Sequence, residues 1–293
     1  MRGLAVAVLV GLAVVGPASA AVTVRDMLGR AVTLPAPPAR IVSLVPSATE
    51  ILFGLGADDR LVGVTDYCDF PAAARDKRSV GGMVSPSLET IVALRPDLVI
   101  ATDEGNREET FGQLRRLRIP IFLVHAHRLA DVAAVITRLG QLTGRAGAAR
   151  AMIEPMERRI EAVRRAVAPF PRPRVLYAVW PEPLIVPGRD AIVTDLIDAA
   201  GGVSITATDG DSYPRFSLEA AVARNPEVII LATHGAGTGK ASKEKFERFA
   251  SLAAVRAGRL HTADGDLMHR YTPRVVDGLE RLARAIHPEA FPR

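Results

Sequence analysis

The stretch SLETIVALRPDLVIA, residues 87–101, contains a helix start, a helix and a buried strand in close succession. Ser87 is typical of a helix N-cap, and Glu89 would then fall in the first turn. The apolar run after Pro96 is typical of a strand buried on both faces of a sheet. The same order returns 130 residues later as SLEAAVARNPEVIIL, residues 217–231, with Ser, Glu and Pro at matching places.

A second phrase is repeated in the same order. RIVSL, residues 40–44, is echoed 134 residues later by RVLYA, residues 174–178. Two phrases repeated at nearly one offset argue for two related α/β lobes. A cleft between two lobes is a usual place for a ligand.

Strands and helices alternate around the repeated phrases, which predicts α/β lobes with mostly parallel sheets. A hairpin is expected at 22–38, with its turn at Leu28-Gly29, and Ser47 or Thr49 is expected to cap the first helix. The expected strands are residues 40–45, 61–65, 97–102, 120–125, 174–180, 227–233 and 259–263. The expected helices are residues 47–56, 87–95, 108–118, 190–202, 217–225, 243–252 and 273–286.

A long helical signal from 129 to 167 separates the two sets of strands. Its second part has an apolar stripe with arginines on the other faces, formed by Met152, Met156, Ile160 and Val163. Pro155 is expected to kink this helix or to begin a new one. The predicted organisation is an N-terminal lobe at 21–143, a linking helix at 144–170 and a C-terminal lobe at 171–293.

The first twenty residues, MRGLAVAVLVGLAVVGPASA, have the layout of a cleavable secretory signal ending at Ala20. The apolar run is short for a membrane span, and no cysteine near the cleavage point offers a lipid anchor. Cys68 is the only cysteine, so no internal disulfide is possible. The net charge of +5 comes from interspersed charges rather than a basic block. We expect a soluble periplasmic protein with no nucleic-acid partner.

No pattern in the chain predicts catalysis. The nucleophile elbow G-x-S-x-G is absent, and no carboxylate pair or Cys/His arrangement stands out by spacing. His125 and His127 follow an expected strand end, but two imidazoles one residue apart are a weak metal signal. We therefore expect no enzyme, no metal site and no cofactor.

Three aromatic residues, Tyr67, Trp180 and Tyr213, fall in loops or just beyond strands. Each alone is as compatible with covering a core as with touching a ligand. Together they favour a cleft that holds a large, partly apolar ligand by its ring faces. Asp266 and Arg270, four residues apart, either form a structural ion pair or meet a polar edge of the ligand.

The repeated glutamates, Glu89 and Glu219, have two explanations. A carboxylate in the first helical turn is stabilised by the helix dipole by roughly 0.3–1 kcal/mol, which accounts for each locally. The alternative is that one exposed carboxylate on each lobe contacts arginines of a partner protein.

Residues 22–71, from VTVRDMLGRAVTL to DYCDFP, followed by SLETIVALRPDLVIA, closely resemble the iron-siderophore, haem and cobalamin class of periplasmic substrate-binding proteins, which serve ABC importers. The resemblance covers essentially the whole mature chain. It implies two Rossmann-like α/β lobes joined by one long rigid helix, with modest closure on the ligand. It also implies that Glu89 and Glu219 engage arginine pockets of a dimeric membrane permease, and that the free protein is a monomer.

Within that class the chain looks most like the cobalamin-binding branch. DYCDFP matches the Tyr-x-Asp-aromatic-Pro stretch of that branch, which implies that Tyr67 contacts the corrin ring. Met83 departs from an aromatic residue of the branch, and the match of Trp180 is positional only. The ligand-binding residues implied are Pro46, Tyr67, Met83, Trp180, Tyr213, Asp266 and Arg270.

The resulting hypothesis is a binding protein that captures a corrinoid, with cobalamin as the first candidate, and delivers it to an importer. The alternative within the class is a haem or ferric-siderophore carrier, in which Tyr67 would be an iron ligand. An exported enzyme that uses the same cleft is a weaker alternative, because no catalytic arrangement supports it. A structural or adhesion module is disfavoured by the single-copy globular pattern.

Overall fold

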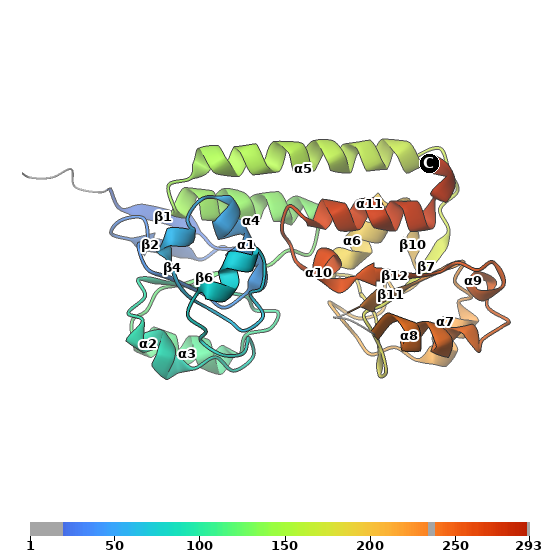
Figure 1. The fold of residues 1–293 in the computed structure, drawn as a ribbon, viewed down its shortest axis with the longest axis horizontal. Helices are drawn as coiled ribbons and strands as arrows, with labels where there is room; N and C mark the ends of the chain where they lie inside the picture. The colour runs from blue at the N-terminus through green and yellow to red at the C-terminus, as the bar shows by residue number, and fades with distance from the viewer. Residues whose placement is uncertain (1–19, 234–237, 292–293) are drawn as a thin grey trace, which may run out of the picture.

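The computed structural model describes residues 20–233 and 238–291. The expected signal segment, residues 1–20, lies outside the described residues except for Ala20. Figure 1 shows two α/β halves side by side, with one long helix running along both. No helix among the described residues is both long and apolar enough to cross a membrane.

The N-terminal lobe is built on a four-stranded parallel sheet in the order β4-β3-β5-β6. Helices cover both faces of this sheet, as its continuous apolar strands require. The expected hairpin at 22–38 is present as β1 and β2. The elements are β1 Val22–Arg25, β2 Ala31–Leu34, β3 Ile41–Ser43, α1 Pro46–Gly54, η1 Asp58–Arg60, β4 Leu61–Val64, η2 Ala72–Asp76, α2 Leu88–Ala93, β5 Leu98–Ala101, α3 Glu108–Arg116 and β6 Ile121–Leu123.

The C-terminal lobe has a second four-stranded parallel sheet, in the order β10-β7-β11-β12. A short hairpin, β8–β9, extends from the end of β7. The elements are β7 Arg174–Ala178, β8 Trp180–Pro181, β9 Leu184–Ile185, α6 Ile192–Ala199, β10 Val203–Ser204, α7 Leu218–Ala223, β11 Val228–Thr233, α8 Thr238–Glu247, α9 Ala253–Arg256, β12 Leu260–Asp264, α10 Gly265–His269, α11 Val275–Ile286 and η3 Pro288–Ala290.

The two sheets share one topology: within each lobe the second strand in chain order lies outside the first, and the third and fourth follow on the other side. The repeated phrases occupy equivalent elements, since RIVSL and RVLYA form the first strands, β3 and β7. The two Ser-Leu-Glu phrases form α2 with β5 and α7 with β11. The α/β fold with parallel sheets is therefore as the sequence predicts.

The arginine that opens each repeated first strand makes the same contacts in both lobes. The backbone N–H of Arg40 donates to the carboxylate of Asp97 (3.0 Å), and its guanidinium donates to two carbonyls just after α2, those of Leu94 (2.6 Å) and Arg95 (3.2 Å). In the other lobe the N–H of Arg174 donates to Glu227 (2.9 Å), and its guanidinium donates to the carbonyl just after α7 (3.0 Å). In each lobe these contacts tie the start of the first strand to the residues just before the third strand in chain order.

The lobes are joined by two packed helices, α4 Leu129–Leu142 and α5 Ala146–Val167. The expected apolar stripe faces the core, where Met156, Ile160 and Val163 are buried. The alternative of a new helix at Pro155 is wrong, because α5 continues through it as one helix of 22 residues. Pro155 and Ala151, whose carbonyl loses its hydrogen-bond donor, are both exposed. Water can therefore satisfy that carbonyl.

Helix starts show where sequence reasoning succeeds and fails. Ser87 and Ser217 are N-caps as expected, accepting from backbone N–H groups at 3.1 and 3.0 Å. Neither Ser47 nor Thr49 caps α1: its N-cap is Val45, and Pro46 occupies the first turn. Proline suits that position because its fixed φ is already helical and its missing N–H would be unpaired there.

Candidate ligand-binding site

A cavity of about 370 Å³ opens between the lobes. The N-terminal lobe contributes Val45, Pro46, Ser47, Tyr67, Met83, Thr102 and Glu104 to its lining. The C-terminal lobe contributes Val179, Tyr213, Gly265, Asp266, His269, Arg270 and Tyr271. Most of these residues lie in the loops or helix starts that come shortly after strands β3, β4, β5, β7 and β12. The carboxyl ends of parallel strands are where open α/β sheets bind ligands.

Six of the seven predicted ligand-binding residues line this cavity: Pro46, Tyr67, Met83, Tyr213, Asp266 and Arg270. Trp180 is outside the lining, on β8 next to the lining residue Val179, with 44% of its surface exposed. His125 and His127 are also outside the lining. The binding roles of all seven residues stay predictions.

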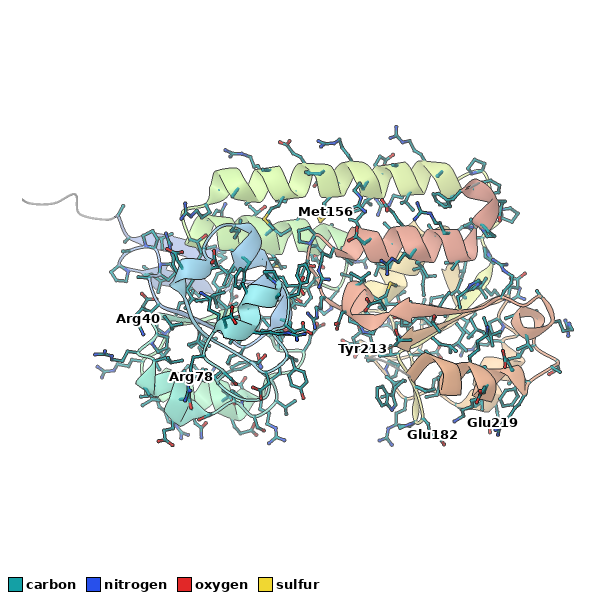
Figure 2. All side chains as sticks on the ribbon, in the orientation of Figure 1. Arg40, Arg78, Met156, Glu182, Tyr213 and Glu219 are labelled. Atoms are coloured by element: carbon teal, nitrogen blue, oxygen red, sulfur yellow. The ribbon has the colours of Figure 1, made fainter. Side chains whose placement is uncertain are left out.

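The aromatic residues of the cleft differ in how firmly they are held. Tyr213, from the C-terminal lobe (Figure 2), stands edge-on to the ring of His269, with ring centroids 6.1 Å apart. His269 is in turn edge-on to the buried ring of Tyr177, whose hydroxyl is 3.3 Å from Nε2 of His269. Tyr67, by contrast, is 61% exposed. The cleft therefore offers one phenol held by neighbouring rings and one exposed ring face.

Arg270 is enclosed by carboxylates from both lobes. Its Nη1 donates to Glu50 (2.9 Å) and Asp69 (2.7 Å), and its Nη2 lies 3.1 Å from Asp266. Only 13% of the Arg270 side chain is exposed. Burial by itself raises the pKa of Asp69, but the hydrogen bond and charge of Arg270 outweigh it and lower that pKa. The charged guanidinium is therefore already paired with three carboxylates in the absence of a ligand.

Glu50 makes this group of charges a link between the lobes. Its carboxylate, 4% exposed on α1, accepts from Arg270 and also from Arg274, whose Nε and Nη2 lie 2.9 and 2.8 Å away. The guanidinium of Arg274 lies over the ring of Phe70, 3.6 Å from its centroid. Two residues of the C-terminal lobe are thus held against the N-terminal lobe by ion pairs and a cation–π contact.

A second polar contact between the lobes lies beside Glu104. Nδ1 of His127 is 2.7 Å from the carbonyl of Asp190 in the other lobe and 3.3 Å from Glu104. A carbonyl can only accept, so Nδ1 carries the hydrogen. Burial raises the pKa of Glu104, against the charge of His127, while a hydrogen bond to Asp103 raises the pKa of His125. Within the described part of the chain, no group of three or more His, Cys, Asp or Glu could hold a metal ion.

Glu89 and Glu219 are exposed in the first turns of α2 and α7. Figure 1 shows α2 and α7 along the same edge of the molecule, opposite α5, and Figure 2 shows Glu219 there. The hydrogen bond from its own backbone, followed by that from Ser217, lowers the pKa of Glu219. The helices that carry the two glutamates thus lie along a common side of the molecule.

Sequence reasoning did not assign the polar or charged residues Asp69, Glu104 and His269 to the site. Asp69 stands inside the DYCDFP motif, and Glu104 comes just after β5, so strand-end position was an available signal. Tyr271, in the same segment as Asp266 and Arg270, is a candidate from the sequence and lines the cavity. Nothing local marked His269, because its ring contacts, Tyr177 and Tyr213, come from distant segments.

The fold and the cleft define a class, the two-lobe α/β binding proteins with a ligand cleft between parallel sheets. A model of the periplasmic binding protein family matches residues 41–267, and the chain belongs to that family. Its relatives are substrate-binding proteins of ABC importers rather than enzymes.

Three relatives bear this out. The vitamin B12-binding protein of Vibrio cholerae is 29% identical over 85% of this chain and 89% of that protein. Its crystal structure superposes with a TM-score of 0.77, covering 88% of this chain and 99% of that one.

An uncharacterized ABC transporter substrate-binding lipoprotein of Bacillus subtilis is 28% identical over 92% of this chain and 87% of that protein. A periplasmic haem-binding protein of Pseudomonas aeruginosa, 28% identical, has a TM-score of 0.78 and covers 87% of this chain and 95% of that one. Since the B12-binding and haem-binding relatives are about equally similar, the ligand has to be argued from the site.

Proposed function

We propose that this protein captures a corrinoid, with cobalamin as the first candidate, in the periplasm and delivers it to an ABC importer. The observation that carries the choice is the charge of the cleft. Arg270 is the one guanidinium or ammonium group among its described lining residues, and it is already paired with three carboxylates. A corrinoid bears mostly neutral amides at its edge, whereas haem bears two carboxylates.

The lining residues suit a flat macrocycle with a polar edge. Tyr67 and Tyr213 offer ring faces and edges to the macrocycle, and Pro46 and Met83 add apolar contact. Asp266, 52% exposed on its side chain, can accept hydrogen bonds from amide N–H groups of the ligand. Trp180, exposed beside Val179, would contact a ligand large enough to extend past the cavity.

Delivery would use the common edge formed by α2 and α7. Glu89 and Glu219 are exposed there and could pair with arginines on the two halves of a permease dimer. Export through the segment 1–20 and a monomeric free form belong to the same proposal.

Haem is the second candidate, because the cleft contains donors suited to iron. Tyr67 has an exposed phenol, and His269 contributes an imidazole to the lining. Tyrosine oxygen and histidine nitrogen are both established axial ligands of haem iron. A ferric siderophore is the remaining member of this alternative.

Titration of the purified protein with cyanocobalamin and, separately, with hemin tests the proposal. We expect saturable heat release with cyanocobalamin at one ligand per protein, because one cavity spans the two lobes. No response to cyanocobalamin, together with a Soret shift on adding hemin, would overturn the corrinoid choice in favour of haem.

A further inference from the structure

Asp69 is the N-terminal lobe's exposed contribution to the charges around Arg270. It lies in the loop after β4 and accepts from Nη1 of Arg270 at 2.7 Å, with 37% of its side chain exposed. Arg75 approaches its other oxygen at 3.8 Å, but that arginine is 71% exposed, so solvent screens the contact. The main electrostatic partner of Asp69 is therefore Arg270.

Every ion-pair partner of Arg270 is a carboxylate. Glu50, Asp69 and Asp266 supply three carboxylates, whereas Arg270 and Arg274 supply two guanidinium groups. Glu104 adds another carboxyl to the lining. A ligand carboxylate that approached Arg270 would meet three carboxylates already in contact with it and would have to displace one of them. A neutral amide would meet no such repulsion.

We propose that Asp69 is a specificity-determining residue, which occupies Arg270 and thereby excludes ligands that carry carboxylates at their edge. Asp69 acts through Arg270 rather than by touching the ligand, so it is a positioning residue. The inference rests on the proposed function, because it assumes that a macrocyclic ligand occupies this cleft. On this proposal, the carboxylate of Asp69 lets the protein distinguish macrocycles with amides at their edge from those with carboxylates there.

The test compares hemin with hemin dimethyl ester, which keeps the iron and the ring but lacks both carboxylates. Dissociation constants are measured from the Soret band for the wild type and Asp69→Asn. We expect the preference for hemin over its ester to rise about tenfold in Asp69→Asn, since the variant removes one negative charge in contact with the guanidinium that a ligand carboxylate would approach. A merely structural role of Asp69 would change both affinities alike and leave the ratio constant.

Asp59→Asn is the matched control, because it removes one exposed negative charge from the same lobe away from the cleft. Its hemin-to-ester ratio should equal that of the wild type. If Asp69→Asn fails to fold, Asp266→Asn serves instead. It removes a different carboxylate partner of Arg270, one from the C-terminal lobe, and should also raise the hemin-to-ester ratio. The inference is overturned if the folded variant has the same hemin-to-ester affinity ratio as the wild type. It is also overturned if the folded variant does not bind hemin at all. The cyanocobalamin titration of the wild type is a separate measurement, so failure of the proposed function remains distinguishable.

Discussion

Arg270 forms ion pairs with three carboxylates in the cleft, two from the N-terminal lobe and one from its own lobe. Its spacing from Asp266 predicts either an ion pair or a ligand contact, and the 3.1 Å approach of the two side chains confirms the ion pair. Its contacts with Glu50 and Asp69 join segments about two hundred residues apart. No local sequence pattern predicts such contacts, because they form only when both lobes are folded and packed against each other.

The phenol oxygen of Tyr67 distinguishes the two candidate ligands, because it could bind haem iron but is not needed for stacking on a corrin ring. In Tyr67→Phe the ring face remains, so cyanocobalamin affinity should change less than about threefold, whereas Tyr67→Ala should lose about tenfold through lost stacking and burial. Thermal stability should hold in both variants, because the side chain is 61% exposed. Calorimetric titration measures the affinities.

The same variants examined with hemin reveal whether the phenol oxygen binds iron. If Tyr67→Phe loses hemin binding and its Soret signature while Tyr67→Ala leaves cyanocobalamin affinity intact, the stacking role is wrong. Tyr177, buried at the other end of the His269 contact, is unsuitable as a control because its loss would disturb the core.

At the level of elements, regular segments could be predicted from the sequence and short ones could not. All strands of the two sheets except β10, and the helices α2 to α7, lie within or close to their expected ranges, because each has a sustained apolar pattern and a start or stop signal. The strand β10, the hairpin β8–β9 and the helices α9 and α10 were missed. Each is five residues or shorter, too short for a period to be recognised.

Pro155 allows the effect of a proline inside a continuous helix on the free energy of unfolding to be measured. Pro155→Ala should stabilise the protein by about 1–3 kcal/mol, because the variant restores an N–H that can donate to the carbonyl of Ala151. The site is exposed, so no packing is lost. Urea unfolding followed by circular dichroism measures the change.

Arg158→Ala is the matched control on the same helix, exposed and without a backbone donor to restore. It should shift stability by less than about 0.5 kcal/mol. A destabilised Pro155→Ala would mean that the proline holds a bend that packing against α4 and α11 requires.

At the scale of the whole molecule, the repeated lobe places the proposed ligand site and the proposed docking residues on different parts of the protein. The strand ends of both sheets meet at the cleft, whereas α2 and α7 lie along one outer edge, away from the linking helix (Figure 1). The helix dipole accounts for a glutamate in each first turn without any partner. Only a functional measurement can distinguish that local role from a docking role, because both predict the same exposed side chains.

Glu89→Ala combined with Glu219→Ala is expected to retain cyanocobalamin affinity within twofold and to abolish uptake by cells that depend on this protein. Both residues are outside the cavity lining, so the ligand site is untouched, while the two carboxylates proposed to meet permease arginines are gone. The control, Glu154→Ala with Glu157→Ala, removes two exposed carboxylates from α5 on the opposite edge and should leave uptake normal. Uptake of labelled cyanocobalamin is the measurement. Normal uptake by the first pair would reduce Glu89 and Glu219 to helix-end electrostatics. A loss in both pairs would point to the general surface charge instead, because only position distinguishes the two sets.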